Sequence, residues 1–201
     1  MKKTTTYFCT ECGSESPKWA GKCPVCGAWN CMVEQKAEKP KSNGKKPSAA
    51  RLVKAYPITA LEEEEEIRFS TGMGELDRVL GGGAVKGSLV LVGGAPGIGK
   101  STLMLQICQT LGHFARVLYV SGEESTRQLR MRAKRLQVDT GNLLVLSETR
   151  LGDVLACAEQ EKPDVLIIDS IQTLYNEDSD GIPGGIGQVK QCTLTLMQLA
   201  K

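Results

Sequence analysis

Residues Gly94 to Ser101 are the feature that most constrains the fold of this chain. They read GAPGIGKS and match the phosphate-loop pattern G-x-x-x-x-G-K-[ST]. The apolar run SLVLV comes before them and an amphipathic stretch comes after them. The pattern is therefore expected between a strand and a helix, a context that a chance glycine-rich turn would lack. We predict a loop that binds a nucleoside triphosphate.

Each part of this loop has an expected task. Glycines allow the backbone to approach the phosphates and point N–H groups at them, and the helix dipole adds to the attraction. Lys100 is expected to reach the β- and γ-phosphates, and the Ser101 hydroxyl to ligate Mg²⁺. The residues predicted to bind ATP are Gly94, Ala95, Pro96, Gly97, Ile98, Gly99, Lys100, Ser101 and Thr102, together with Asp169 from a later strand.

Two acidic positions complete the predicted hydrolysis site. Asp169 ends the apolar run VLIID, which is how P-loop enzymes place a second carboxylate near Mg²⁺. Glu123 and Glu124 follow another apolar run, and we predict Glu123 as the general base that polarises water. The alternative is that these acids only begin the next helix, where they suit its dipole. Glu124 fits that alternative better.

The part of the chain from residue 57 to 201 has the pattern of a three-layer α/β domain with a mostly parallel sheet. Short apolar runs alternate with amphipathic stretches, and each run is followed by a turn signal. The predicted strands are Ser88–Val92, Arg116–Val120, Leu143–Leu146 and Val165–Asp169. The predicted helices are Lys100–Gly112, Ser125–Leu136, Arg150–Glu161 and a last one from about Val189 to the end.

Four cysteines near the N-terminus form two C-x-x-C knuckles, Cys9 with Cys12 and Cys23 with Cys26. Four thiolates at this spacing suit a closed tetrahedral Zn²⁺ site, which would supply folding energy that a short segment lacks. A redox C-x-x-C pair and an iron–sulfur cluster are the competing interpretations. The other cysteines, Cys31, Cys108, Cys157 and Cys192, lack the spacing and are expected to be buried thiols.

Composition divides the chain into a zinc module over 1–33, a basic flexible linker over 34–56 and an ATPase domain over 57–201. The net charge of +2 is too small to indicate a nucleic-acid or membrane partner. No apolar run reaches the length of a membrane span, and the two N-terminal lysines precede no apolar signal region. We expect a cytoplasmic protein with no membrane partner.

Four segments carry a family resemblance. They are CxECG…KWxGxCPxCGxWN from Cys9 to Asn30, STGMGELDRVLGGGAVKGSLVLVGGAPGIGKST from Ser70 to Thr102, YVSGEES from Tyr119 to Ser125, and LIIDSIQT from Leu166 to Thr173. Their order and spacing cover nearly all of the chain except the linker. On these segments the chain resembles the bacterial RadA (Sms) family of DNA repair and recombination proteins.

The resemblance implies a RecA-like ATPase with ATP, Mg²⁺ and Zn²⁺ as cofactors. It implies binding to single-stranded DNA, branch migration of branched recombination intermediates, a RecA-type recombinase as partner, and a homo-oligomer of hexameric form. Family members also carry a KNRFG motif and a Lon-protease-like C-terminal domain, and this chain contains neither. We therefore expect that it is a fragment of a longer protein.

Two groups of basic residues are candidates for DNA contact, although a solvated linker and a solvated helix face are the favoured interpretations of both. One lies between Lys36 and Lys54, and the other consists of Arg127, Arg130, Arg132, Lys134 and Arg135. The better DNA candidate is the glycine-rich stretch from Asn176 to Gln188, with Lys190 beside it, which by resemblance matches a mobile DNA-facing loop; a plain disordered surface loop is the alternative. Two other functions stay open: a zinc-containing P-loop kinase of a small substrate, and a nucleotide-switched adaptor without enzymatic activity.

Overall fold

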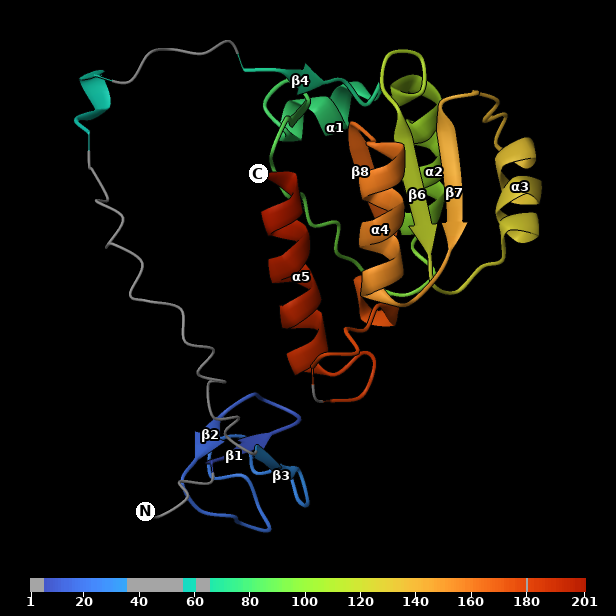
Figure 1. The fold of residues 1–201 in the computed structure, drawn as a ribbon. Coiled ribbons are helices and arrows are strands. Elements are labelled where there is room, and N and C mark those ends of the chain that lie inside the picture. The colour runs from blue at the N-terminus through green and yellow to red at the C-terminus, as the bar shows by residue number, and fades with distance from the viewer. Residues whose placement is uncertain (1–5, 36–55, 61–65, 180) are drawn as a thin grey trace. The chain divides into compact units, whose positions relative to one another are not determined.

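The computed structural model describes residues 6–35, 56–60, 66–179 and 181–201, and the chain separates into two units at Glu66 and Ile67. Most of the predicted linker, 36–55, lies outside the described residues, as do the glutamates at 62–65. Figure 1 shows the elements of both units. Among the described residues, no helix has the length and apolar character needed to cross a bilayer.

The first unit is built around a small antiparallel sheet. Its strands are β1 (Thr6–Cys9), β2 (Glu15–Ser16) and β3 (Met32–Gln35), in the order β2-β1-β3. The register pairs Cys9 with Met32, so the first knuckle begins where β1 ends. A single turn of 3-10 helix, η1 (Ile58–Ala60), precedes the second unit.

The second unit contains a parallel sheet of three strands, β6 (Val117–Ser121), β7 (Leu143–Ser147) and β8 (Val165–Asp169). Their order is β7-β6-β8, so the first strand along the chain lies in the middle. Strand β8 has the predicted bounds, β6 begins one residue late, and β7 extends one residue further. The prediction of a parallel sheet in an α/β domain is confirmed.

Helices cover both faces of this sheet, as Figure 1 shows. Side chains alternate along β6, so Val117 and Tyr119 pack toward α2 and α3, whereas Leu118 and Val120 pack toward α4 and α5. The helices are α2 (Lys100–Leu111), α3 (Thr126–Arg135), α4 (Leu151–Glu161) and α5 (Ile186–Ala200), with a 3-10 turn η2 (Ile171–Thr173) after β8. Helix α5 begins three residues before its predicted start.

A short segment precedes the phosphate loop and is fastened by one carboxylate. Strands β4 (Arg68–Phe69) and β5 (Ala84–Val85) pair antiparallel on either side of α1 (Gly74–Val79). Asp77 on α1 accepts hydrogen bonds from the Ser70 hydroxyl at 2.7 Å and from the Thr71 backbone N–H at 2.8 Å. These bonds lower the pKa of Asp77 and hold the end of β4 against α1.

The predicted strand Ser88–Val92 is wrong. The structure gives this segment no strand, and no described residue pairs with it along a ladder. Leu89, Val90 and Leu91 are 49%, 47% and 85% exposed, the opposite of what a buried central strand requires. Apolar side chains favour burial, but a strand also needs a neighbouring backbone to accept and donate its hydrogen bonds. In the described sheet, β8 is the edge strand, and this segment does not pair with it.

Candidate functional site

The phosphate loop is an exposed turn that leads directly into α2. Gly97 and Gly99 have φ values of +78° and +102°, which other residues adopt only with strain. Gly99 is the N-cap of α2 and offers no side chain to the helix, so the N–H groups of the first turn stay available to an anion. The loop thus leaves the N–H groups at the start of α2 free to face an anion such as phosphate.

Lys100 lies at the first position of α2 and folds over the loop. Its ammonium donates to the carbonyl oxygens of Gly94 at 2.8 Å and Ala95 at 2.9 Å. A hollow of about 250 Å³ opens beside it. The residues that line this hollow are Gly97, Gly99, Lys100, Ser101, Thr102 and Arg132. The predicted loop residues from Gly97 onward, with the exception of Ile98, therefore converge on one concave surface.

Asp169 lies at the carboxyl end of β8, and a buried tyrosine orients it. The Tyr119 hydroxyl on the neighbouring strand donates to Asp169 Oδ2 at 2.6 Å. Burial, and then this contact, raise the pKa of Tyr119, so it remains a donor at neutral pH. Tyr119 is fully buried. Its role could not be predicted from the sequence, because a tyrosine in an apolar strand is expected to be buried whether or not its hydroxyl has a partner. The chemistry of Asp169 and Ser101, two oxygen donors, suits Mg²⁺.

Glu123 and Glu124 occupy the turn after β6, at the same end of the sheet as Asp169. The register places Ser121 opposite Asp169, and the Gly122 N–H donates to the Asp169 carbonyl at 3.2 Å. The Ser121 hydroxyl accepts from the backbone N–H of Glu124 at 3.0 Å, which sets the direction of the turn. The Glu123 side chain is exposed, whereas Glu124 is partly buried.

Arg132 on α3 is the residue at this site that the sequence did not assign to the nucleotide. Its guanidinium forms an ion pair with Glu124 at 2.8 Å, and it also lines the hollow over the phosphate loop. From the sequence, Arg132 is only one of several basic residues of α3 that are candidates for DNA contact. The sequence does contain a signal that could have indicated this position. Arg132 lies two helical turns after Ser125, the N-cap of α3, so both residues are on the face of the helix that follows the acidic turn.

The glycine-rich stretch from Asn176 to Gln188 is partly fastened to α5. Gln188 is 2% exposed, and its side chain accepts from the Asn176 N–H at 2.8 Å. Its amide donates to the carbonyls of Asn176 at 3.1 Å and Ser179 at 2.8 Å. The final residues of the stretch lie inside α5, and residue 180 lies outside the described residues.

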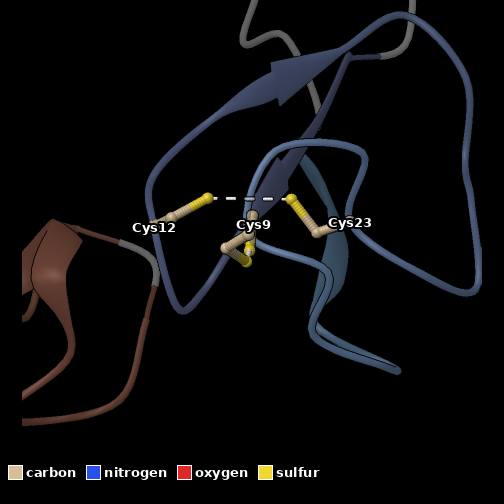
Figure 2. Close-up of side chains that lie close together, drawn as sticks. Cys9, Cys12 and Cys23 are labelled. Carbon is tan, nitrogen blue, oxygen red and sulfur yellow. Dashed lines mark hydrogen bonds between the residues drawn. The ribbon is translucent and has the colours of Figure 1, made fainter.

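The second site is the cysteine cluster of the first unit. The four sulfur atoms of Cys9, Cys12, Cys23 and Cys26 all lie within 4.8 Å of one another. Cys9 and Cys26 Sγ are 3.6 Å apart, and Cys12 and Cys23 Sγ are 3.7 Å apart. Figure 2 shows the sulfurs of Cys12 and Cys23 facing each other across the cluster. A tetrahedral zinc–thiolate site has sulfurs about 3.8 Å apart, so this arrangement fits Zn²⁺.

The two knuckles repeat one backbone geometry, which explains how a short segment can present thiolates. The Gly13 N–H donates to the Cys9 carbonyl and the Gly27 N–H to the Cys23 carbonyl, both at 2.9 Å. The backbone N–H of Cys26 and then the Ser14 hydroxyl lower the pKa of Cys23 to about 5. The thiolate, the form that binds metal, is therefore favoured at Cys23.

Cys31 lies beside this cluster without belonging to the group of four. It is 4% exposed, its sulfur lies 3.4 Å from Cys9 Sγ, and it donates to the Ala28 carbonyl. Cys108 and Cys192 are buried in the second unit, whereas Cys157 is only partly buried.

Comparison with protein families agrees with both sites. Residues 59–191, about two thirds of the chain, match the AAA domain. Residues 7–34 match the rubredoxin metal binding domain. The first match contains the phosphate loop, both acids of the turn after β6, and Asp169. The second contains all four clustered cysteines. The chain thus combines an N-terminal zinc ribbon with an AAA-type P-loop domain.

Comparison with curated proteins gives relatives along the whole chain. The chain is 50% identical over 206 aligned residues to the DNA repair protein RadA of Bacillus subtilis. This alignment covers 100% of the chain and 45% of that protein. The chain is also 51% identical to the RadA of Listeria monocytogenes and 47% identical to that of Pseudomonas aeruginosa, covering 44% of each. The chain therefore spans somewhat less than half the length of these relatives.

Proposed function

Because the chain belongs to the AAA domain family and is similar along its whole length to bacterial RadA proteins, we propose that it is the ATP-binding part of a DNA-dependent ATPase of recombinational repair. In this proposal the protein binds single-stranded DNA and promotes branch migration of recombination intermediates. It works in the cytoplasm as a hexamer together with a RecA-type recombinase. The domain boundaries at 1–33, 34–56 and 57–201 are part of the same proposal.

One observation carries the enzymatic part of this proposal. The carboxyl ends of β6 and β8 lie side by side, which brings the Gly122–Glu124 turn next to Asp169. In α/β proteins, ligands bind at this end of the strands. Helix α2, which starts at the phosphate loop, packs against the same two strands through Leu105 and Cys108. The helix that follows the phosphate loop therefore packs on the strands that carry the proposed Mg²⁺ carboxylate and the candidate base.

In the proposed mechanism, Lys100 would bind the β- and γ-phosphates, and Ser101 and Asp169 would hold Mg²⁺. When bound, the metal ion would neutralise charge on the phosphate oxygens. Tyr119 keeps the Asp169 carboxylate in place by its 2.6 Å hydrogen bond. Glu123, exposed at the end of β6, takes a proton from the attacking water.

Replacing Glu123 with glutamine is expected to separate binding from hydrolysis. The variant keeps the size and polarity of the side chain but removes the basic oxygen. We expect kcat to fall by about 10²–10⁴-fold, the usual contribution of a general base, while ATP affinity stays unchanged. Steady-state hydrolysis and equilibrium nucleotide binding would be measured on the same preparation. Glu159→Gln on α4, also an exposed acid, is the matched control. Unchanged turnover in Glu123→Gln would remove this residue from the mechanism.

Single-stranded DNA is expected to stimulate ATP hydrolysis. The assay uses a protein that contains this chain and is as long as its relatives. The measurement compares the initial rate of phosphate release with and without the DNA, at two salt concentrations. Stimulation should weaken as salt rises, because DNA binding releases counterions. Hydrolysis without any response to DNA would overturn the motor function. Transfer of the γ-phosphate to a small acceptor would support the kinase, and binding without hydrolysis would support the adaptor.

A further inference from the structure

The hollow over the phosphate loop has one wall that does not come from the loop or from the start of α2. That wall is Arg132, which α3 contributes from further along the chain. The other lining residues are Gly97, Gly99, Lys100, Ser101 and Thr102. Each of these belongs to the segment that holds phosphate, so the guanidinium lies where a bound phosphate chain would be within its reach.

A carboxylate holds this guanidinium in position. Arg132 forms an ion pair with Glu124 Oε1 at 2.8 Å, and the two side chains are 25% and 26% exposed. The other carboxylate oxygen of Glu124 is buried and has no hydrogen-bond partner among the described residues. Arg132 also lines a second hollow, of about 390 Å³, together with Glu124. The guanidinium therefore lies between the phosphate loop and the acidic turn.

The start of α3 is rigid, which fixes the direction of Arg132. Ser125 caps the helix through a reciprocal capping box with Gln128, and Leu129 is 1% exposed in the core. These contacts leave little freedom for the helix to rotate or slide. A guanidinium on such a helix presents a planar set of N–H donors that matches two phosphate oxygens at once.

We propose that Arg132 binds the terminal phosphate of the nucleotide and that Glu124 positions its guanidinium for this contact. This inference rests on the proposed ATPase function. The terminal phosphate is favoured over the inner phosphates because α3 continues directly from the turn that carries Glu123. The base must reach water beside the γ-phosphate, so the helix that follows it approaches the same end of the nucleotide.

The test compares a non-hydrolysable ATP analogue with ADP, because only the analogue carries the terminal phosphate. Binding of each to the 201-residue chain with Mg²⁺ would be measured by calorimetry. For Arg132→Ala we expect the Kd of the analogue to rise at least about tenfold, in line with the loss of a charge-assisted hydrogen bond. The Kd of ADP should change less than about twofold.

Three further variants make the test specific. Arg132→Lys keeps the charge without the planar fork, so its loss of analogue affinity should be intermediate. Arg130→Ala removes an exposed arginine of the same helix that does not line the hollow, and should change neither Kd. Glu124→Gln should weaken analogue binding less than Arg132→Ala does, because the guanidinium is still present. Thermal unfolding of each variant checks that α3 remains folded.

The outcomes separate this inference from the function on which it rests. If the unsubstituted chain binds neither nucleotide, both the proposed ATP binding and the proposed role of Arg132 are overturned. If that chain binds both nucleotides and Arg132→Ala binds the analogue equally well, only the role of Arg132 is overturned. Equal weakening of analogue and ADP binding overturns it as well, because it would mean that Arg132 supports the loop rather than the terminal phosphate.

Discussion

Replacing Lys100 with alanine is expected to lower ATP turnover by at least about 10²–10³-fold and to weaken ATP binding strongly. The lysine is the only side-chain ammonium among the residues that line the hollow over the phosphate loop. Clamps of this kind stabilise the charge of a transferring phosphoryl group, and the loss of one such donor lowers kcat by about 10²–10³-fold. Steady-state phosphate release at saturating ATP, with nucleotide titration beside it, measures both effects.

The control for this variant must remove a lysine without touching the loop. Lys86→Ala fits, because Lys86 is exposed just after β5 and its backbone N–H still donates to Ile67. The bonds from Lys100 to the Gly94 and Ala95 carbonyls lie in an exposed turn, so little change in melting temperature is expected. Retained turnover in a folded Lys100→Ala protein would contradict the assignment of the phosphate loop.

Removing zinc is expected to unfold the first unit and to leave the second intact. The buried side chains around the cluster are few: Cys9, Cys23, Cys31 and Met32. Such a small apolar cluster cannot offset the entropy of ordering the segment, so metal binding would supply most of its folding energy. The clusters of the second unit consist of residues 105–196 of that unit itself. Its thermal unfolding should therefore be independent of zinc.

The two tryptophans give a direct measurement of this effect. Trp19 and Trp29 are the only tryptophans of the chain, and both lie in the first unit. Their indole N–H resonances should collapse to random-coil positions when a chelator is added or when Cys12 is replaced by serine. Cys157→Ser, a cysteine of α4 outside the cluster, should keep one zinc per chain. A zinc-dependent shift in the melting of the second unit would place the domain boundary elsewhere.

The sites that the sequence predicted well are those whose geometry is local. The phosphate loop and the two cysteine knuckles depend on spacings of a few residues, and glycine at a required position leaves the backbone few alternatives. The bounds of α2, α3, α4 and α5 agree with the predicted helices to within three residues, because caps and periodicity are also local signals, whereas α1 was not predicted. The prediction of a strand at Ser88–Val92 is wrong for the opposite reason: pairing depends on a neighbouring strand, and that neighbour can come from any part of the chain.

The sequence by itself determined that this chain has a phosphate loop, a four-cysteine metal site and a parallel α/β domain, since each follows from short-range pattern. Only the tertiary structure decided the order β7-β6-β8, which brings Tyr119 to Asp169 across fifty residues of sequence. It also decided that Arg132, alone among the basic residues of α3 in lining the hollow over the phosphate loop, lies beside Glu124 and that loop. These contacts arise when helices and strands pack, and packing depends on the shapes of many distant side chains at once.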